Sequence, residues 1–303
     1  MRNLCIKLAT YILCLNLLVN TATVVSGDTF VDETGRRLVI SRCPQRIVSL
    51  APSITEILFA LKLEERIVGV TRFSYYPEEA QKKPKIGAYR NPNMEEILAL
   101  EPDLVVGIAD GNPPDVIMRL EKWGIPVYLS DPKTVEGIFN TVISISKITG
   151  TQETAYKLVK DLRMRIKNVM NKVRDGNHPS VFLQINAKPI ITVGMNTFQD
   201  QIIRMAGGVN IAGSNKARYP IYNIEEILRK SPDIIIISTM ARGMVPELQR
   251  KEWMRWTSIP AVKQGRIFFI NSDIIDRPSP RIVEGLEEMA KLLHPEKFNK
   301  WHE

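Results

Sequence analysis

Aromatic and charged side chains recur at the ends of predicted strands, where they could hold a ligand without altering it. Loops that follow strands are the positions where α/β sheets bind their ligands. Each flat aromatic ring can bury about 150–250 Å² of surface, so the set suits a large, rigid and amphipathic ligand. The side chains concerned are Phe73, Tyr75, Tyr76, Tyr89, Arg90, Tyr219, Tyr222, Asp273, Asp276, Arg277 and Arg281.

Catalytic motifs are missing from the sequence. It contains no G-x-S-x-G turn, no G-x-G-x-x-G loop and no phosphate-binding Lys-Ser/Thr loop. The histidines, His178, His294 and His302, fall at a breaker between the two halves and near the C-terminus. We therefore expect no enzymatic activity, no cofactor and no zinc or manganese site, which would need several converging imidazoles. A secreted enzyme with a two-lobed fold is the alternative of another class.

The chain contains one internal repeat. Residues 95–106 read EEILALEPDLVV, and residues 225–236 read EEILRKSPDIII. A second matching pair follows in the same order, over residues 124–137 and 265–285. Two ordered matches indicate a duplicated unit. We therefore expect two related lobes whose equivalent loops face each other.

Each half alternates short apolar runs with helical stretches. Runs that are apolar at every position are typical of parallel strands covered on both faces. The predicted fold class is therefore α/β, with two small Rossmann-like lobes. A hairpin over residues 29–40 precedes the first lobe. The predicted strands cover residues 46–50, 67–70, 104–106, 127–129, 181–185, 234–237 and 266–270, and the predicted helices include 53–61 and 93–100.

A single long backbone helix is predicted between the lobes. Apolar residues from Ala155 to Val173 fall three and four apart and form one stripe, bounded by Thr151 and by the breaker at 175–179. At 1.5 Å per residue the helix is about 35 Å long. Such a connector is stiff, so we expect no large hinge closure. The predicted division is 28–134 for the N-terminal α/β lobe, 135–177 for the connecting helical segment and 178–303 for the C-terminal α/β lobe.

The first 27 residues are predicted to be a cleaved signal peptide. A short basic start precedes an apolar run at residues 8–19, and small residues follow before Asp28. The run is shorter than the roughly 20 residues that span a bilayer, although a retained anchor is the alternative. Cleavage would leave Cys43 as the single cysteine, which cannot form an internal disulfide. We expect an exported, periplasmic protein.

The net charge of +8 comes from acidic and basic residues that are interleaved along the chain. A nucleic-acid-binding surface would instead need a basic stripe with interleaved aromatic residues. We therefore expect no nucleic acid as a partner. We also expect the protein to be a monomer.

Six stretches of the sequence resemble the cobalamin and iron-siderophore family of periplasmic substrate-binding proteins, and most closely its vitamin B12 branch. The resemblance implies two α/β lobes of the helical-backbone metal-receptor type, a shallow cleft between them and delivery of the ligand to an ABC transporter permease dimer. The matching stretches are RIVSLAPSITE at 46–56, GVTRFSYYP at 69–77, IGAYRNPNMEEILALEPDLVV at 86–106, VFLQ at 181–184, AGGVNI at 206–211 and RPSPRIVEGLE at 277–287.

The resemblance also implies a ligand and the residues that bind it. Aromatic residues of both lobes would pack against a corrin ring, and two charged residues would lie at the rim of the second lobe. Two positions, Ile108 and Ile185, depart from the aromatic residues found in the B12 branch. The implied ligand-binding residues are Phe73, Tyr89, Arg90, Tyr219, Asp273 and Arg277.

A ferric siderophore or heme is the alternative ligand. A catecholate or hydroxamate iron chelate would need arginines that face an anion. Arg72, Arg90, Arg218 and Arg277 could supply them.

One glutamate per lobe is implied to dock onto the permease. The repeat supplies Glu95 and Glu225 at identical places in the two EEIL motifs. Carboxylates in the first turn of a helix also interact favourably with the helix dipole, and both roles can hold together.

Overall fold

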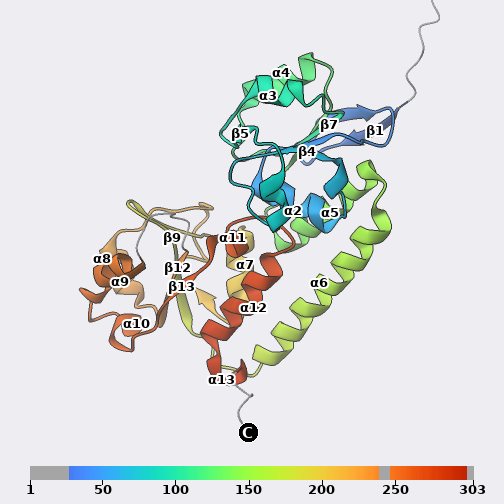
Figure 1. The fold of residues 1–303 in the computed structure, drawn as a ribbon. Coiled ribbons are helices and arrows are strands. Elements are labelled where there is room, and N and C mark those ends of the chain that lie inside the picture. Colours follow the sequence, from blue (N-terminus) through green and yellow to red (C-terminus); the bar gives the residue numbers. More distant parts are fainter. Residues whose placement is uncertain (1–26, 239–245, 299–303) are drawn as a thin grey trace, which may run out of the picture.

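Two α/β lobes and one long helix that runs beside both make up the protein (Figure 1). The computed structural model describes residues 27–238 and 246–298. The predicted signal peptide lies outside the described residues except for its last position. Among the described helices, none is both long enough and apolar enough to cross a membrane.

The N-terminal lobe is built on a parallel four-stranded sheet in the order β4-β3-β7-β8. Leu104 and Val106 of β7 join the larger hydrophobic core, and Val105 between them joins a second core on the other face. The sheet is therefore covered on both sides, which explains strands that are apolar at every position. Its strands are β3 (Ile47–Ser49), β4 (Ile67–Val70), β7 (Leu104–Ile108) and β8 (Val127–Ser130), and its helices are α2 (Pro52–Ala60), α3 (Met94–Ala99), α4 (Pro114–Lys122) and α5 (Val135–Thr149).

Short elements complete this lobe. The predicted hairpin pairs β1 with β2, and the Asp32 carboxylate closes its turn by accepting hydrogen bonds from the backbone N–H groups of Thr34 and Arg36, both at 2.9 Å. These elements are β1 (Asp28–Val31), β2 (Arg37–Ile40), η1 (Glu64–Arg66), η2 (Glu78–Lys82), β5 (Gly87–Ala88) and β6 (Asn91–Pro92).

The C-terminal lobe repeats this plan. Its sheet has the order β10-β9-β12-β13, and β11 also pairs with β9. In β12, Ile234 and Ile236 face the larger core, while Ile235 and Ile237 face a separate core beneath α8, α9 and α10. Its elements are β9 (Ser180–Ala187), β10 (Ile190–Thr192), α7 (Phe198–Met205), β11 (Val209–Asn210), α8 (Ile224–Lys230), β12 (Ile234–Ser238), α9 (Pro246–Met254), α10 (Pro260–Lys263), β13 (Ile267–Ile270), α11 (Ser272–Ile275), α12 (Ile282–Leu293) and α13 (Pro295–Phe298).

The duplicated architecture predicted from the two EEIL motifs is present in the topology. The parallel orders β4-β3-β7-β8 and β11-β9-β12-β13 correspond strand by strand. The motifs themselves form α3 and α8, each capped by an asparagine side chain, Asn93 or Asn223, that accepts a backbone hydrogen bond from the first turn. Equivalent loops therefore end up at equivalent edges of the two sheets.

The predicted long helix is α6 (Gln152–Val173), whose 22 residues extend about 33 Å. Its apolar stripe packs on α5 of the first lobe and on α12 of the second, and Figure 1 shows it spanning both. Arg165 of α6 also forms an ion pair with Glu287 of α12, with 2.8 Å between Nη2 and Oε2. One continuous core thus links the two lobes through this helix.

Candidate ligand-binding cleft

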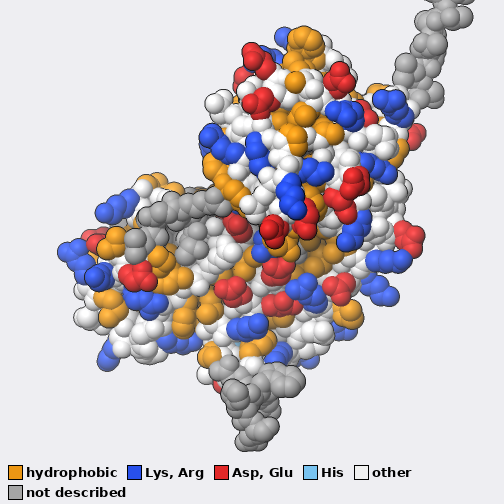
Figure 2. Space-filling view, viewed as in Figure 1, with side chains coloured by type: hydrophobic (Ala, Val, Ile, Leu, Met, Phe, Trp, Pro, Cys, Tyr) orange, Lys and Arg blue, Asp and Glu red, His pale blue; other side chains and the backbone are white. Residues whose placement is uncertain are grey.

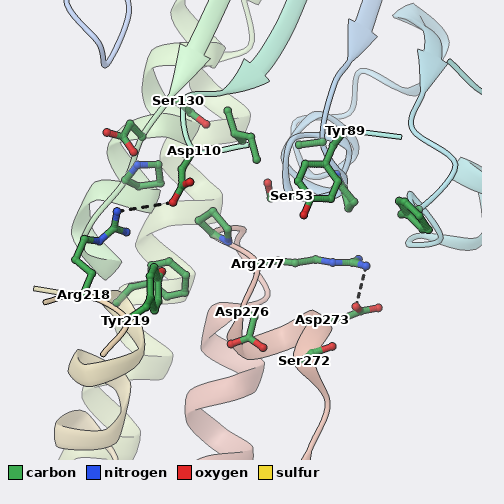
Figure 3. Close-up of a pocket in the computed structure, with 18 of the residues that line it drawn as sticks. Ser53, Tyr89, Asp110, Ser130, Arg218, Tyr219, Ser272, Asp273, Asp276 and Arg277 are labelled. Carbon is green, nitrogen blue, oxygen red and sulfur yellow. Dashed lines mark ion pairs between the residues drawn. The ribbon is translucent and has the colours of Figure 1, made fainter. Parts of the chain in front are cut away.

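A cleft of about 720 Å³ lies between the lobes and is lined by residues of both (Figure 3). Most of its walls are loops that leave the carboxyl ends of β3, β4, β7, β8 and β13, where parallel sheets place ligands. The lining residues are Ala51, Pro52, Ser53, Phe73, Tyr75, Tyr89, Ile108, Asp110, Ser130, Asp131, Pro132, Phe198, Arg218, Tyr219, Asn271, Ser272, Asp273, Asp276, Arg277 and Pro278.

Tyr89 is held in the cleft by the loop that follows β7. Its backbone carbonyl accepts a hydrogen bond of 2.8 Å from Asn112 Nδ2, which also donates to the carbonyl of Leu50 at 3.0 Å. Gly111 packs against the ring: it has a φ of +133°, and a Cβ there would lie 2.9 Å from Tyr89 Cε2. Only glycine allows both this backbone conformation and this close approach.

Three aromatic residues of the cleft each carry an adjacent arginine over the ring. A guanidinium within about 6 Å of a ring centre is attracted to the electron-rich face. These contacts restrain both partners, so they fix the rings and occupy the cations. The distances from Cζ to the ring centre are 5.4 Å for Arg72 and Phe73, 5.6 Å for Arg90 and Tyr89, and 5.2 Å for Arg218 and Tyr219.

Arg90, predicted to bind the ligand, does not line the cleft. It is exposed, and its Nε donates to the hydroxyl of Tyr89 at 3.2 Å. The other five predicted ligand-binding residues, Phe73, Tyr89, Tyr219, Asp273 and Arg277, all lie in the cleft lining. The two positions that were expected to depart from the B12 branch, Ile108 and Ile185, lie in different parts of the structure. Ile108 lines the cleft, whereas Ile185 packs against the larger core.

Two tyrosines grouped with the strand-end aromatics point elsewhere. Tyr222 is 5% exposed and stacks on Phe182 in the C-terminal lobe, with 6.3 Å between ring centres. Tyr76 lies in a separate hollow, where the guanidinium of Arg281 sits 3.8 Å from its ring centre. Of the neighbouring residues Tyr75 and Tyr76, only Tyr75 lines the cleft.

Arg277 is shared between the lobes. Its Nη1 lies 2.9 Å from Oε1 of Glu56 on α2, and its Nη2 lies 2.7 Å from Oδ1 of Asp273. The other oxygen of Glu56 accepts a hydrogen bond from the hydroxyl of Ser279. Burial raises the pKa of Glu56, and the bonds from Ser279 and Arg277 oppose that rise. This buried ion pair ties the N-terminal lobe to the segment that follows α11.

Arg218 approaches Asp110 from the opposite lobe, with 3.9 Å between Nη1 and Oδ2 (Figure 3). Asp131, which follows β8, forms an ion pair with Lys133. The hairpin also fixes Asp131 in place, since the backbone N–H of Asp131 donates a hydrogen bond of 2.6 Å to the Glu33 carboxylate. Arg277 is therefore already held by carboxylates, whereas Arg218 only approaches one, and its buried Nε has no hydrogen-bond partner. Figure 2 shows acidic and basic side chains interspersed over the visible face of the molecule.

Asp276 has no such cation. Its Oδ2 accepts a hydrogen bond from the hydroxyl of Ser238, and its Oδ1 accepts a long one, 3.5 Å, from Nε2 of Gln199. Among the described residues none forms an ion pair with it. Burial raises its pKa to about 6. Within the same residues, no three His, Cys, Asp or Glu side chains come together as a metal site.

Several lining residues went unrecognised in the sequence, and one signal could have found them. Asp110, Ser130 and Asp131 directly end or follow β7 and β8. The rule that ligands meet the carboxyl ends of parallel strands applies to these loops as well as to the loops rich in aromatic residues. Phe198, at the start of α7, carries no such signal.

The two predicted docking glutamates lie outside the cleft lining. Glu95 and Glu225 are exposed in the first turns of α3 and α8. The described contacts include no ion pair for either carboxylate, so both are available to solvent.

Comparison with known proteins agrees with this architecture. A family model described as periplasmic binding protein matches residues 47–274. The chain is 33% identical to the vitamin B12-binding protein of Vibrio campbellii over 251 residues, which cover 82% of this chain and 88% of that protein. It is 30% identical to the uncharacterized ABC transporter substrate-binding lipoprotein YvrC of Bacillus subtilis, with 92% of this chain and 89% of the relative covered.

Solved structures show the same two-lobed fold. The periplasmic vitamin B12 binding protein BtuF of Vibrio cholerae superposes with a TM-score of 0.73 at 29% identity, covering 85% of this chain and 99% of that one. The periplasmic heme-binding protein RhuT of Roseiflexus sp. RS-1 superposes with a TM-score of 0.75 at 25% identity, covering 84% and 99%. The chain therefore belongs to the periplasmic binding protein family, and it is an extracytoplasmic solute-binding protein rather than an enzyme.

Proposed function

We propose that this substrate-binding protein captures a corrinoid in the interlobe cleft and delivers it to the permease of an ABC importer. The observation that carries the proposal is the lining of the cleft: aromatic rings come from both lobes, and the guanidinium of Arg277 is already bound by two carboxylates. The predicted signal peptide at residues 1–27 and release into the periplasm belong to the same proposal.

The size and surface of the cleft suit a macrocycle. A volume of about 720 Å³ lies in the range of sites that enclose a small organic ligand. Phe73 and Tyr89 line the cleft from one lobe and Tyr219 lines it from the other. Flat rings on two sides give a planar, partly apolar ligand a large contact area at little conformational cost.

The charges in the cleft disfavour an anionic ligand. Arg277 is bound to Glu56 and Asp273, and Arg218 faces Asp110. Arg72 and Arg90, the other candidates for holding a ferric chelate, are stacked on neighbouring aromatic rings and are absent from the lining. A catecholate or a heme propionate would need a guanidinium that is free to bind it. A corrinoid, whose periphery carries neutral carboxamides, needs none.

Relatives support the same ligand class. The Vibrio proteins that match over four fifths of the chain are named for binding vitamin B12. Heme binding is the second candidate, since RhuT shares the fold at a similar TM-score. We favour the corrinoid because Arg277 is already bound by two carboxylates and because the relatives that match over four fifths of the chain are named for vitamin B12.

The test is a ligand panel. Protein that starts at Asp28 should bind cyanocobalamin with one-to-one stoichiometry in calorimetry, and should bind hemin and a ferric catecholate far more weakly. Absorbance spectra of the mixtures report each chromophore independently. Tighter binding of hemin or the iron chelate would overturn the proposal, and chemical alteration of the recovered cobalamin would reveal an activity that a binding protein lacks.

A further inference from the structure

The floor of the cleft holds hydrogen-bond acceptors that the protein itself does not satisfy. Asp276 follows α11, and its carboxylate lines the cleft below Arg277 (Figure 3). Ser238 donates one hydrogen bond to one oxygen, while the contact of the other oxygen with Gln199 is at the 3.5 Å limit of a hydrogen bond. An ionised carboxylate has about four acceptor positions, so at least half of this capacity is unused.

Gln199 adds a second open acceptor. Its side chain is buried, with 2% of the residue exposed, and its Oε1 has no hydrogen-bond partner. A buried polar atom without a partner is unfavourable, and such atoms are rare in folded proteins. In a binding protein, the missing partner can be supplied by the ligand.

The charged groups around Asp276 also favour a ligand that donates hydrogen bonds. The carboxylate of Asp273 lies on the same turn and raises the pKa of Asp276 further, after burial itself. Burial raises the pKa of the Tyr219 hydroxyl, and Arg218 opposes this rise. Arg277 is turned away, toward Glu56 and Asp273. The charge that acts on Asp276 is therefore that of Asp273, which adds negative potential at this point.

We infer that Asp276 and Gln199 form a subsite that selects a ligand bearing a carboxamide or another N–H donor at its edge. A primary amide offers two N–H groups, which can satisfy the carboxylate of Asp276 and Oε1 of Gln199 together. A ligand carboxylate at the same place would meet two acceptors and a negative charge. The inference rests on the proposed corrinoid function and adds the residues that read the ligand's periphery.

The experiment removes the proposed hydrogen bond in two ways, by a change in the protein and by a change in the ligand. Asp276→Asn keeps the size of the side chain and removes its charge. Cyanocobalamin is compared with its monocarboxylic acid isomers, in each of which one peripheral amide is hydrolysed. We expect the variant to bind cyanocobalamin about tenfold or more weakly, as for loss of a charge-assisted hydrogen bond. The wild type should reject at least one acid isomer relative to the amide by about tenfold, and the variant should reduce that difference.

Controls separate the possible failures. Asp115→Asn, at an exposed position of α4 outside the cleft, should bind every ligand as the wild type does. The thermal midpoint of Asp276→Asn should equal or exceed that of the wild type, because the substitution removes a buried charge; a lower midpoint would indicate a structural role. Equal affinity of variant and wild type, or unchanged discrimination among the isomers, would overturn the inference alone. A wild type that does not bind cyanocobalamin would overturn the proposed function, and the inference with it.

Discussion

At the scale of single residues, pairs of chain neighbours hold the aromatic rings of the cleft in place. An arginine stacks on the ring of its chain neighbour at Phe73, Tyr89 and Tyr219. Gly111 lets a loop close against the ring of Tyr89. Each ring is therefore held in place before the ligand arrives, which lowers the conformational entropy that binding must remove.

Truncation of these rings tests their role. Tyr89→Ala and Tyr219→Ala should each weaken cyanocobalamin binding by about tenfold or more, because each removes a large part of an aromatic contact surface. Calorimetry measures the loss, and the double variant should lose more than either single one. Tyr156→Ala is the matched control, since Tyr156 is 57% exposed on α6, outside the cleft. Wild-type affinity in both cleft variants would contradict the assignment of the site.

At the scale of secondary-structure elements, helices α3 and α8 are the repeated feature. α3 and α8 start with the same asparagine cap and the same glutamate pair, and each precedes a central strand of its sheet. The duplication therefore presents Glu95 and Glu225 as equivalent exposed carboxylates on separate lobes. A permease dimer with basic residues facing both lobes could engage them as a pair, although each exposed ion pair contributes only about 0–1 kcal/mol.

Charge reversal distinguishes docking from helix capping. The double variant Glu95→Lys/Glu225→Lys should bind cyanocobalamin in solution as the wild type does, because neither residue lines the cleft. Uptake through the cognate permease in proteoliposomes should fall strongly, and the wild-type rate should decline with added salt. Glu153→Lys, at another exposed helical position, should leave transport unchanged. Normal uptake by the double variant would refute the docking role.

At the scale of the whole molecule, the lobes are joined by α6, by the buried pair of Glu56 with Arg277, and by smaller contacts such as that of Arg218 with Asp110. α6 packs along both lobes, and Glu56 of α2 reaches Arg277 and Ser279 of the other lobe. Both connections resist separation of the lobes, so the cleft has a defined width without ligand. This arrangement agrees with the stiff connector expected from the sequence, and the absence of large hinge closure stays a prediction.

Glu56→Gln tests the interlobe pair. The substitution removes the charge of one of the two carboxylates that bind the Arg277 guanidinium, and we expect the free energy of unfolding to fall by about 1–3 kcal/mol. Denaturant unfolding measures the change. Glu153→Gln breaks an exposed pair with Lys157 and should leave the unfolding midpoint unchanged. An unaltered midpoint for Glu56→Gln would show that this pair contributes nothing to stability.

Local patterns in the sequence determined the elements and their duplication. Continuous apolar runs predicted the strands because parallel strands are covered on both faces, and the three-and-four spacing predicted α6 because it builds one packed stripe. The repeat predicted two lobes of one topology. The resemblance to the family implied six ligand-binding residues, and five of them line the cleft; several lie in loops after strands, where parallel sheets place their ligands.

Only the tertiary structure decided which side chains face the ligand and how they are charged there. Tyr222 and Arg90 follow the same local rules as Tyr219 and Tyr89, yet one packs in a core and the other lies over a ring. The neutralisation of Arg277 depends on Glu56, which lies 221 positions away in the chain. The open acceptors of Asp276 and Gln199 depend on residues from β12, α7 and the segment after α11. Contacts between distant segments set burial and pairing, and no spacing along the chain encodes them.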